Sequence, residues 1–63
     1  MSMENEMVAS AIRRKDDVII ILSDGKAMHG KILMQDDRSV MLKGVSNTNY
    51  LIYKRYIQVI QFK

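Results

Sequence analysis

The chain has 63 residues, a formal net charge of +3 and no cysteine. A chain of this length forms one domain with a small core, and such domains commonly add disulfides, a metal or a partner subunit. The absence of cysteine and the single histidine, His29, exclude a disulfide framework and a zinc site, so we expect stabilisation by oligomerisation. The modest positive charge favours a polyanionic partner only weakly.

The composition predicts a cytoplasmic protein without a membrane partner. The longest apolar run, Val18 to Leu22, is far shorter than the roughly 20 residues that cross a bilayer. The N-terminal segment MSMENEM is acidic, whereas a secretory leader begins with basic residues. A lack of cysteine agrees with a reducing compartment.

Residues 2–15 predict one amphipathic helix. Ser2 is suited to the N-cap, and Glu4 and Glu6 place negative charge in the first turn, where the helix dipole favours it. Basic residues complement the dipole at the other end. The expected apolar stripe consists of Met7, Val8, Ala11 and Ile12, and the basic end of Arg13, Arg14 and Lys15.

Five short strands are predicted between about residues 17 and 62. The continuous aliphatic run Val18–Leu22 is typical of a strand covered on both faces, and Ser23–Lys26 predicts a hairpin turn. Lys26–Gln35 alternates as a second strand, and Gly30 in its middle indicates a sharp bend or a bulge. One face of this strand is expected to carry Met28, Gly30, Ile32 and Met34.

The remaining strands are shorter. Val40–Leu42 predicts the third strand, and Gly44–Thr48 a loop. The stretch YLIYKRYIQVI, Tyr50 to Ile60, predicts two strands joined as a tight hairpin with Lys54 and Arg55 at its tip. The predicted fold class is therefore mainly β, with one N-terminal helix and a strongly bent five-stranded antiparallel open barrel.

An open barrel leaves two strand edges unpaired. The strand NYLIY carries no charge to discourage pairing with another chain, so we expect edge-to-edge association between copies. Association that repeats by a fixed rotation closes into a ring. In such a ring Lys54 and Arg55 converge on the axis, where their repulsion favours a polyanionic ligand.

Several of these residues together resemble the Hfq family, the bacterial Sm-like RNA chaperones. The resemblance covers roughly Glu4 to Ile60 and is strongest at Ile52-Tyr53-Lys54, at Arg13-Arg14 and in the spacing from Gly25 to Gly30 to Asp36. It implies a single Sm-like domain over residues 1–63. It also implies a homohexamer, in which six copies of a chain with net charge +3 carry +18.

The resemblance implies a pore face that binds single-stranded, U-rich RNA. The Tyr-Lys-His signature of the family falls on Tyr53, Lys54 and Arg55, so Arg replaces His and keeps its charge at every relevant pH. The uracil-reading Gln of the helix falls on Asn5, and the stacking aromatic falls on Arg38. A guanidinium replaces an aromatic stacking platform only in part.

Two further surfaces are implied. An RNA-binding rim that promotes annealing falls on Arg13, Arg14 and Lys15. A purine-binding opposite face falls on Gly25, Lys26 and His29, but its stacking aromatic falls on Ile21. Because Ile cannot stack on a base, we expect weak purine-tract binding there.

The function implied is an RNA chaperone that pairs small RNAs with mRNAs in post-transcriptional regulation and stress response. No enzyme activity, cofactor, metal or small-molecule substrate is implied. The alternative is a divergent ring that works mainly as a protein-binding or structural module with weak RNA binding.

Individual residues also have simpler interpretations. Compensation of the helix dipole alone would explain the basic residues at the end of the helix. His29 is also typical of a polar surface residue. Asp36-Asp37-Arg38 is typical of a turn rather than of an acid pair with catalytic chemistry. Three tyrosines are expected at the barrel seam or at the subunit interface: Tyr50, Tyr53 and Tyr56.

Overall fold

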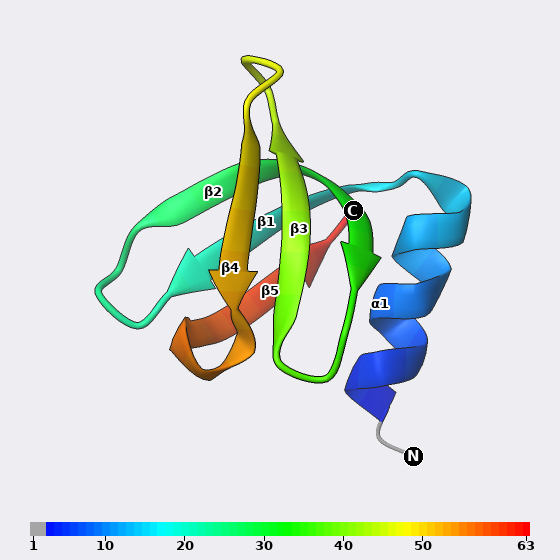
Figure 1. Cartoon of the computed structure of the whole chain (residues 1–63), viewed down its shortest axis with the longest axis horizontal. Coiled ribbons are helices and arrows are strands. Elements are labelled where there is room, and N and C mark those ends of the chain that lie inside the picture. The colour runs from blue at the N-terminus through cyan, green and yellow to red at the C-terminus, as the bar shows by residue number, and fades with distance from the viewer. Residues whose placement is uncertain (1–2) are drawn as a thin grey trace.

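The computed structural model describes the backbone of residues 3–63 and the side chains from Asn5 onward. One helix precedes a five-stranded antiparallel sheet (Figure 1). The elements are α1 (Met3–Arg14), β1 (Asp17–Leu22), β2 (Ala27–Gln35), β3 (Ser39–Gly44), β4 (Asn49–Tyr53), the one-turn 3-10 helix η1 (Lys54–Tyr56) and β5 (Ile57–Phe62). The predicted fold class is confirmed.

Helix α1 forms where the sequence predicts it, although the predicted N-cap Ser2 lies outside the described residues. The helix ends in a Schellman motif, because the amide of Asp16 donates to the carbonyl of Ala11 and the amide of Lys15 to that of Ile12. Lys15 occupies the left-handed position of this motif, with φ 57°. Within the part of the chain that the structure describes, no helix is long and apolar enough to cross a membrane.

The strands are ordered β4-β3-β2-β1-β5, so β4 and β5 form the two edges of an unclosed sheet. Figure 1 shows how the curvature of β2 brings β3 and β4 across β1 and β5. The predicted Lys54–Arg55 hairpin is wrong, since β4 pairs with β3 and β5 pairs with β1. Consequently η1 connects two opposite edges of the barrel rather than two paired strands.

At Gly30 the backbone of the bent strand β2 lies very close to the backbone of β3. Gly30 pairs with Val18 on one side and with Gly44 on the other, and a Cβ at this position would lie 2.1 Å from the carbonyl oxygen of Lys43. The register shift in β2 comes later, between Ile32 and Met34. Of the two alternatives predicted at Gly30, a sharp bend or a bulge, the bulge lies in the segment that follows this residue.

The bulge changes which side chains of β2 face inward. Ile32 is buried, and Met28 packs against the core as a partly buried residue. Met34, predicted to share the face of Ile32, is 59% exposed, because the extra residue between Ile32 and Met34 reverses the alternation. Leu33 is also exposed.

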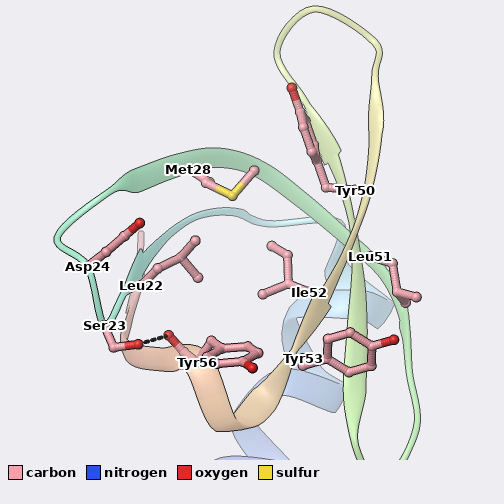
Figure 2. Close-up of a pocket in the computed structure, with 9 residues that line it drawn as sticks. All are labelled: Leu22, Ser23, Asp24, Met28, Tyr50, Leu51, Ile52, Tyr53 and Tyr56. Carbon is pink, nitrogen blue, oxygen red and sulfur yellow. Dashed lines mark hydrogen bonds between the residues drawn. The ribbon is translucent and has the colours of Figure 1, made fainter.

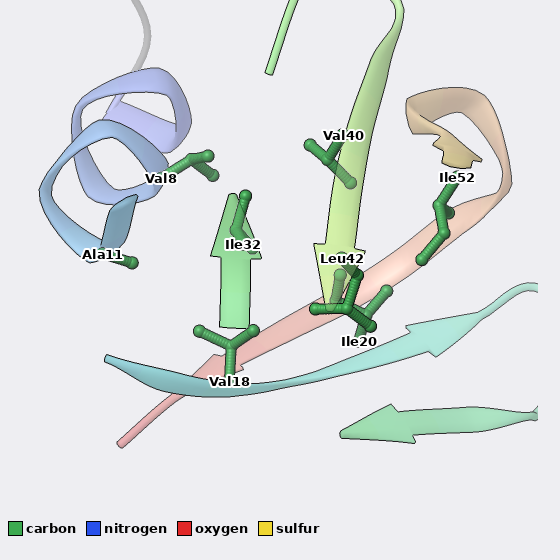
Figure 3. Close-up of a cluster of buried hydrophobic side chains, with 8 residues drawn as sticks. All are labelled: Val8, Ala11, Val18, Ile20, Ile32, Val40, Leu42 and Ile52. Atoms are coloured by element: carbon green, nitrogen blue, oxygen red, sulfur yellow. The ribbon is translucent and has the colours of Figure 1, made fainter. Parts of the chain in front are cut away.

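The core lies between α1 and the concave side of the sheet (Figure 3). In β1, Val18 and Ile20 on one face are buried, and Ile19 and Ile21 on the other face are half-buried. The sequence predicted that both faces are covered, but only one face is fully covered. Side chains from the helix and four strands meet here. They are Val8, Ala11, Val18, Ile20, Ile32, Val40, Leu42 and Ile52.

Candidate nucleic-acid interface

Four of the five residues predicted for the pore face gather around one hollow, here called the η1 hollow. It has a volume of about 490 Å³ and lies between η1 and the β2–β3 turn. All of its lining residues except the half-buried Lys54 are exposed, so a ligand can reach it. The lining consists of Asp37, Arg38, Tyr53, Lys54 and Arg55. The fifth predicted residue, Asn5, is exposed on α1 and is not part of this lining.

The β2–β3 turn is built around the carboxylate of Asp36. Its Oδ1 accepts hydrogen bonds from the amide of Arg38 at 2.9 Å, from the amide of Ser39 at 2.7 Å and from the Ser39 hydroxyl at 3.0 Å. These donors hold the pKa of Asp36 below its ordinary value, and the charge of Lys54 adds a smaller effect. Asp36 is therefore the anchor of a turn, as the simpler interpretation proposed.

The β2–β3 turn also positions η1. The amide of Lys54 donates to the carbonyl of Arg38 at 2.7 Å, and the Lys54 ammonium donates to Oε1 of Gln35 at 3.0 Å. An ammonium has three donors, so Lys54 keeps others for a ligand. Lys54 is thus held at a defined place beside the hollow.

Arg55 lies against two tyrosine rings. Its Cζ is 4.9 Å from the ring centroid of Tyr56 and 6.0 Å from that of Tyr53, distances typical of cation–π contacts. Its Nη2 donates to the Tyr56 hydroxyl at 3.2 Å. The two rings meet edge to face, with centroids 6.5 Å apart and planes at 71°. The guanidinium therefore has a defined position on the exposed surface.

Charge and shape make the η1 hollow suited to a nucleic-acid strand. Arg38, Lys54 and Arg55 contribute three positive charges to its lining and Asp37 one negative charge. The Tyr53 ring, half exposed, adds an aromatic surface. Cations that contact phosphate, next to planar groups that stack on bases, are the elements of single-strand recognition.

The predicted rim residues are exposed at the end of α1. Arg13, Arg14 and Lys15 are neighbours on the last turn and the Schellman motif. Arg14 Nε lies 3.8 Å from Asp16 Oδ2, and the Arg14 side chain is mostly exposed, so this ion pair contributes little stability. The basic group is therefore available to a polyanion.

The residues predicted for the opposite face do not share one hollow. Gly25 and Lys26 belong to the β1–β2 turn, where Gly25 has φ 92° and the amide of Lys26 donates to Asp24 Oδ1 at 3.0 Å. His29 lines a separate hollow of about 490 Å³ with Tyr50 and the β3–β4 loop. The turn alone accounts for Gly25, because a positive φ is costly for other residues.

A family model described as Hfq related matches residues 6–62, nearly the whole chain. The chain belongs to this Hfq-related family. The resemblance to the Hfq family is thereby confirmed.

Two solved structures show the same fold as this Hfq-related chain. The crystal structure of a protein described as the pleiotropic translational regulator Hfq has a TM-score of 0.91 and 22% identity, covering 95% of this chain and 98% of that one. An Hfq protein from Anabaena sp. has a TM-score of 0.85 and 27% identity, covering 95% of each chain. A search of curated proteins gives no match. Family and fold together support an Sm-like RNA-binding protein.

The three tyrosines of this Hfq-related chain are partly exposed. Tyr50, Tyr53 and Tyr56 are 38%, 50% and 48% exposed. They surround a second hollow, of about 330 Å³, between β4 and the β1–β2 turn (Figure 2). Their placement at the barrel seam or at a subunit interface stays a prediction.

Sequence reasoning missed two residues next to the η1 hollow. Gln35 binds the Lys54 ammonium, although it lies 19 positions earlier and no local pattern links the two. Tyr56 contacts the Arg55 guanidinium, and the adjacency of a basic and an aromatic residue could have indicated this. Among the described side chains, no group of three His, Asp or Glu lies close enough to hold a metal ion.

Proposed function

We propose that this Hfq-related chain is an RNA chaperone that pairs small RNAs with mRNAs in the cytoplasm and thereby regulates them after transcription. It acts by binding, without catalytic chemistry or cofactor. The observation that supports this function is the η1 hollow, where Arg38, Lys54 and Arg55 lie beside the exposed ring of Tyr53. A single-stranded, U-rich RNA segment is the proposed ligand.

The proposed active form is a closed ring of Sm-like domains, with six subunits by analogy with the family. The two edge strands support it, because neither Asn49–Tyr53 nor Ile57–Phe62 contains a charged residue. Leu51 on β4 and Val59 on β5 are 59% and 46% exposed. Pairing β4 of one copy with β5 of the next would cover both edges. This head-to-tail contact gives a closed ring when the rotation between neighbouring copies is a whole-number fraction of a full turn.

RNA binding follows from repetition of the η1 hollow around such a ring. Each copy presents Lys54 and Arg55 on the same face, so a strand passing from subunit to subunit meets cations at regular intervals. Contact with phosphates releases counterions, which makes the affinity strongly dependent on salt.

Annealing is proposed to use the basic end of α1. Arg13, Arg14 and Lys15 are exposed at one site, away from the lining of the η1 hollow. A second RNA strand attracted there would experience less repulsion from the first strand, because the arginines screen its phosphates. The rim would therefore increase the rate of pairing rather than the affinity for a short ligand.

A structural or protein-binding ring is the alternative function. It is favoured by one observation: Arg38, exposed at the hollow, stands where the family resemblance places an aromatic stacking residue. A ring that lost this platform would retain its assembly and bind RNA weakly.

Two measurements on the purified chain separate these functions. Light scattering after size exclusion gives the mass, and fluorescence anisotropy gives the affinity for a short uridine oligoribonucleotide. An RNA chaperone is expected to elute as a ring and to bind the oligonucleotide with strong salt dependence. A ring without RNA affinity would support the structural alternative, and a stable folded monomer at micromolar concentration would contradict both.

A further inference from the structure

The two cations of η1 are held in different ways. The Lys54 ammonium is directed to Gln35 at the end of β2, at 3.0 Å. The Arg55 guanidinium is held against the rings of Tyr53 and Tyr56 and is hydrogen-bonded to the Tyr56 hydroxyl. A different neighbourhood for each cation indicates a different task for each.

Tyr56 is itself anchored from another part of the chain. Its carbonyl accepts a hydrogen bond from the amide of Ser23 at 2.8 Å and another from the Ser23 hydroxyl at 3.2 Å (Figure 2). These bonds connect η1 to the β1–β2 turn. The backbone of Tyr56, whose ring lies beside Arg55, is therefore held in place by Ser23.

A guanidinium held in this way is suited to stacking. It is planar and delocalised, and a nucleobase can stack on its exposed plane. Only one of its five donors is used by the Tyr56 hydroxyl. An ammonium such as that of Lys54 has no plane and acts on phosphate as a point charge.

We propose that Tyr56 is a positioning residue that holds the Arg55 guanidinium as a stacking platform for an RNA base, while Lys54 contacts phosphate. This inference rests on the proposed RNA-binding function and assigns separate roles within it. Arg55 then compensates in part for the missing aromatic at Arg38. Arg55 and Tyr56 together then make the site bind RNA with bases more tightly than abasic RNA.

The test compares two probes of equal length: a uridine oligoribonucleotide and an abasic oligoribonucleotide, which has the backbone alone. Arg55→Lys keeps the charge and removes the plane, and Tyr56→Leu keeps apolar bulk and removes the ring. Each is expected to weaken uridine binding about fivefold or more, the effect of removing one stacked base–side-chain pair, and to leave abasic binding unchanged. Tyr56→Phe keeps the ring and should restore most of the uridine affinity.

Lys54→Ala is the matched control, because it removes the neighbouring cation. It should weaken both probes and lower the slope of log affinity against log salt by about 0.7 for each phosphate that is no longer bound. Light scattering on every variant checks that assembly is unchanged.

Three results would overturn the inference. The first is an Arg55→Lys variant that binds uridine like the parent, and the second is an equal loss on both probes, which identifies a phosphate contact or a structural role. The third is a Tyr56→Leu variant without effect where Arg55→Lys has one. All three presuppose a parent that binds uridine, so they separate this failure from failure of the proposed function, in which the parent itself does not bind.

Discussion

The ammonium of Lys54 donates a hydrogen bond to Oε1 of Gln35 across 3.0 Å, which ties η1 to the end of β2. Lys54 is half-buried there, and its amide also donates to the carbonyl of Arg38. The sequence predicted Lys54 at the tip of a hairpin. Instead, Lys54 contributes both to the local fold and to the charge of the η1 hollow.

The first prediction concerns the double variant Lys54→Ala with Arg55→Ala. It should retain the ring and bind U-rich RNA more weakly, with a salt slope lowered by about 0.7 for each phosphate that the variant no longer binds. Removing the hydrogen bond to Gln35 should reduce the free energy of unfolding by about 1 kcal/mol, offset in part by relief of like-charge repulsion. Anisotropy titrations over a range of salt, with urea unfolding, measure both effects.

The control for this variant removes the same charge elsewhere. Lys43→Ala with Lys63→Ala deletes two exposed lysines that do not line the η1 hollow. This control should bind short U-rich RNA nearly as the parent does. If the double variant of η1 matched the parent in affinity and salt slope, the paired charge would have no role in RNA binding.

A second prediction compares the two faces of the chain. On the η1 side, Lys54 and Arg55 provide two cations, and the guanidinium of Arg55 is planar. On the other side, Ile21 is half-buried and has no ring on which a base could stack. U-rich RNA should therefore bind more tightly than A-rich RNA of the same length. Competition between the two in one anisotropy assay measures the ratio, and an equal or reversed preference would show that the binding face is misassigned.

The third prediction separates binding from annealing at the rim. Arg13→Ala with Arg14→Ala should leave the affinity for a short U-rich oligonucleotide unchanged, because these side chains lie outside the lining of the η1 hollow. It should slow the annealing of two longer complementary RNAs. Stopped-flow measurement with a dye-labelled strand gives the rate, and an unchanged rate would mean that the basic helix end serves the helix dipole alone.

The sequence predicted the elements better than their pairing. Helix, strands and open barrel follow from local periodicity and from the small size of the chain. The Lys54–Arg55 hairpin was wrong because strand pairing is a long-range choice: β4 and β5 are consecutive, yet each finds its partner on an opposite side of the sheet. The exposure of Met34 was missed for a related reason, since the register shift after Ile32 depends on how β3 aligns.

For the site, the family resemblance located residues and the structure gave their contacts. Tyr53, Lys54, Arg55 and Arg38 were selected from the sequence and do share one hollow. The contacts of Gln35 and Tyr56 with the two cations became visible only with side chains in place. Asn5 was selected by the same resemblance, and its role stays a prediction.

The fourth prediction concerns acid stability. The Arg38 and Ser39 amides lower the folded-state pKa of Asp36 below 3.8. A carboxyl whose pKa is depressed by folding contributes stability that is complete above its unfolded pKa and is lost as the pH falls through the folded pKa. Asp36→Asn should therefore be less stable than the parent at neutral pH and show a flatter decline of stability below about pH 4.

Urea unfolding at a series of pH values measures this decline. Some acid sensitivity should persist in Asp36→Asn, because Lys31 likewise lowers the pKa of Asp17. Asp37→Asn is the control, since it removes the neighbouring charge and none of the three hydrogen bonds to Asp36. Identical pH profiles for Asp36→Asn and the parent would rule out this role of the carboxylate.

The last prediction tests the backbone approach that bends the sheet. In Gly30→Ala the new methyl group would lie 2.1 Å from the carbonyl oxygen of Lys43, and backbone cannot rotate away as a side chain can. The β2–β3 pairing would have to separate, so the free energy of unfolding should fall by about 3 kcal/mol or more. Gly44→Ala is the matched control in the partner strand: its methyl group would lie 3.0 Å from Cε2 of Tyr50, an exposed ring that can turn, and the expected decrease is about 1 kcal/mol. Urea unfolding followed by circular dichroism compares the two variants, and similar decreases in both would show that β2 does not require glycine at the bend.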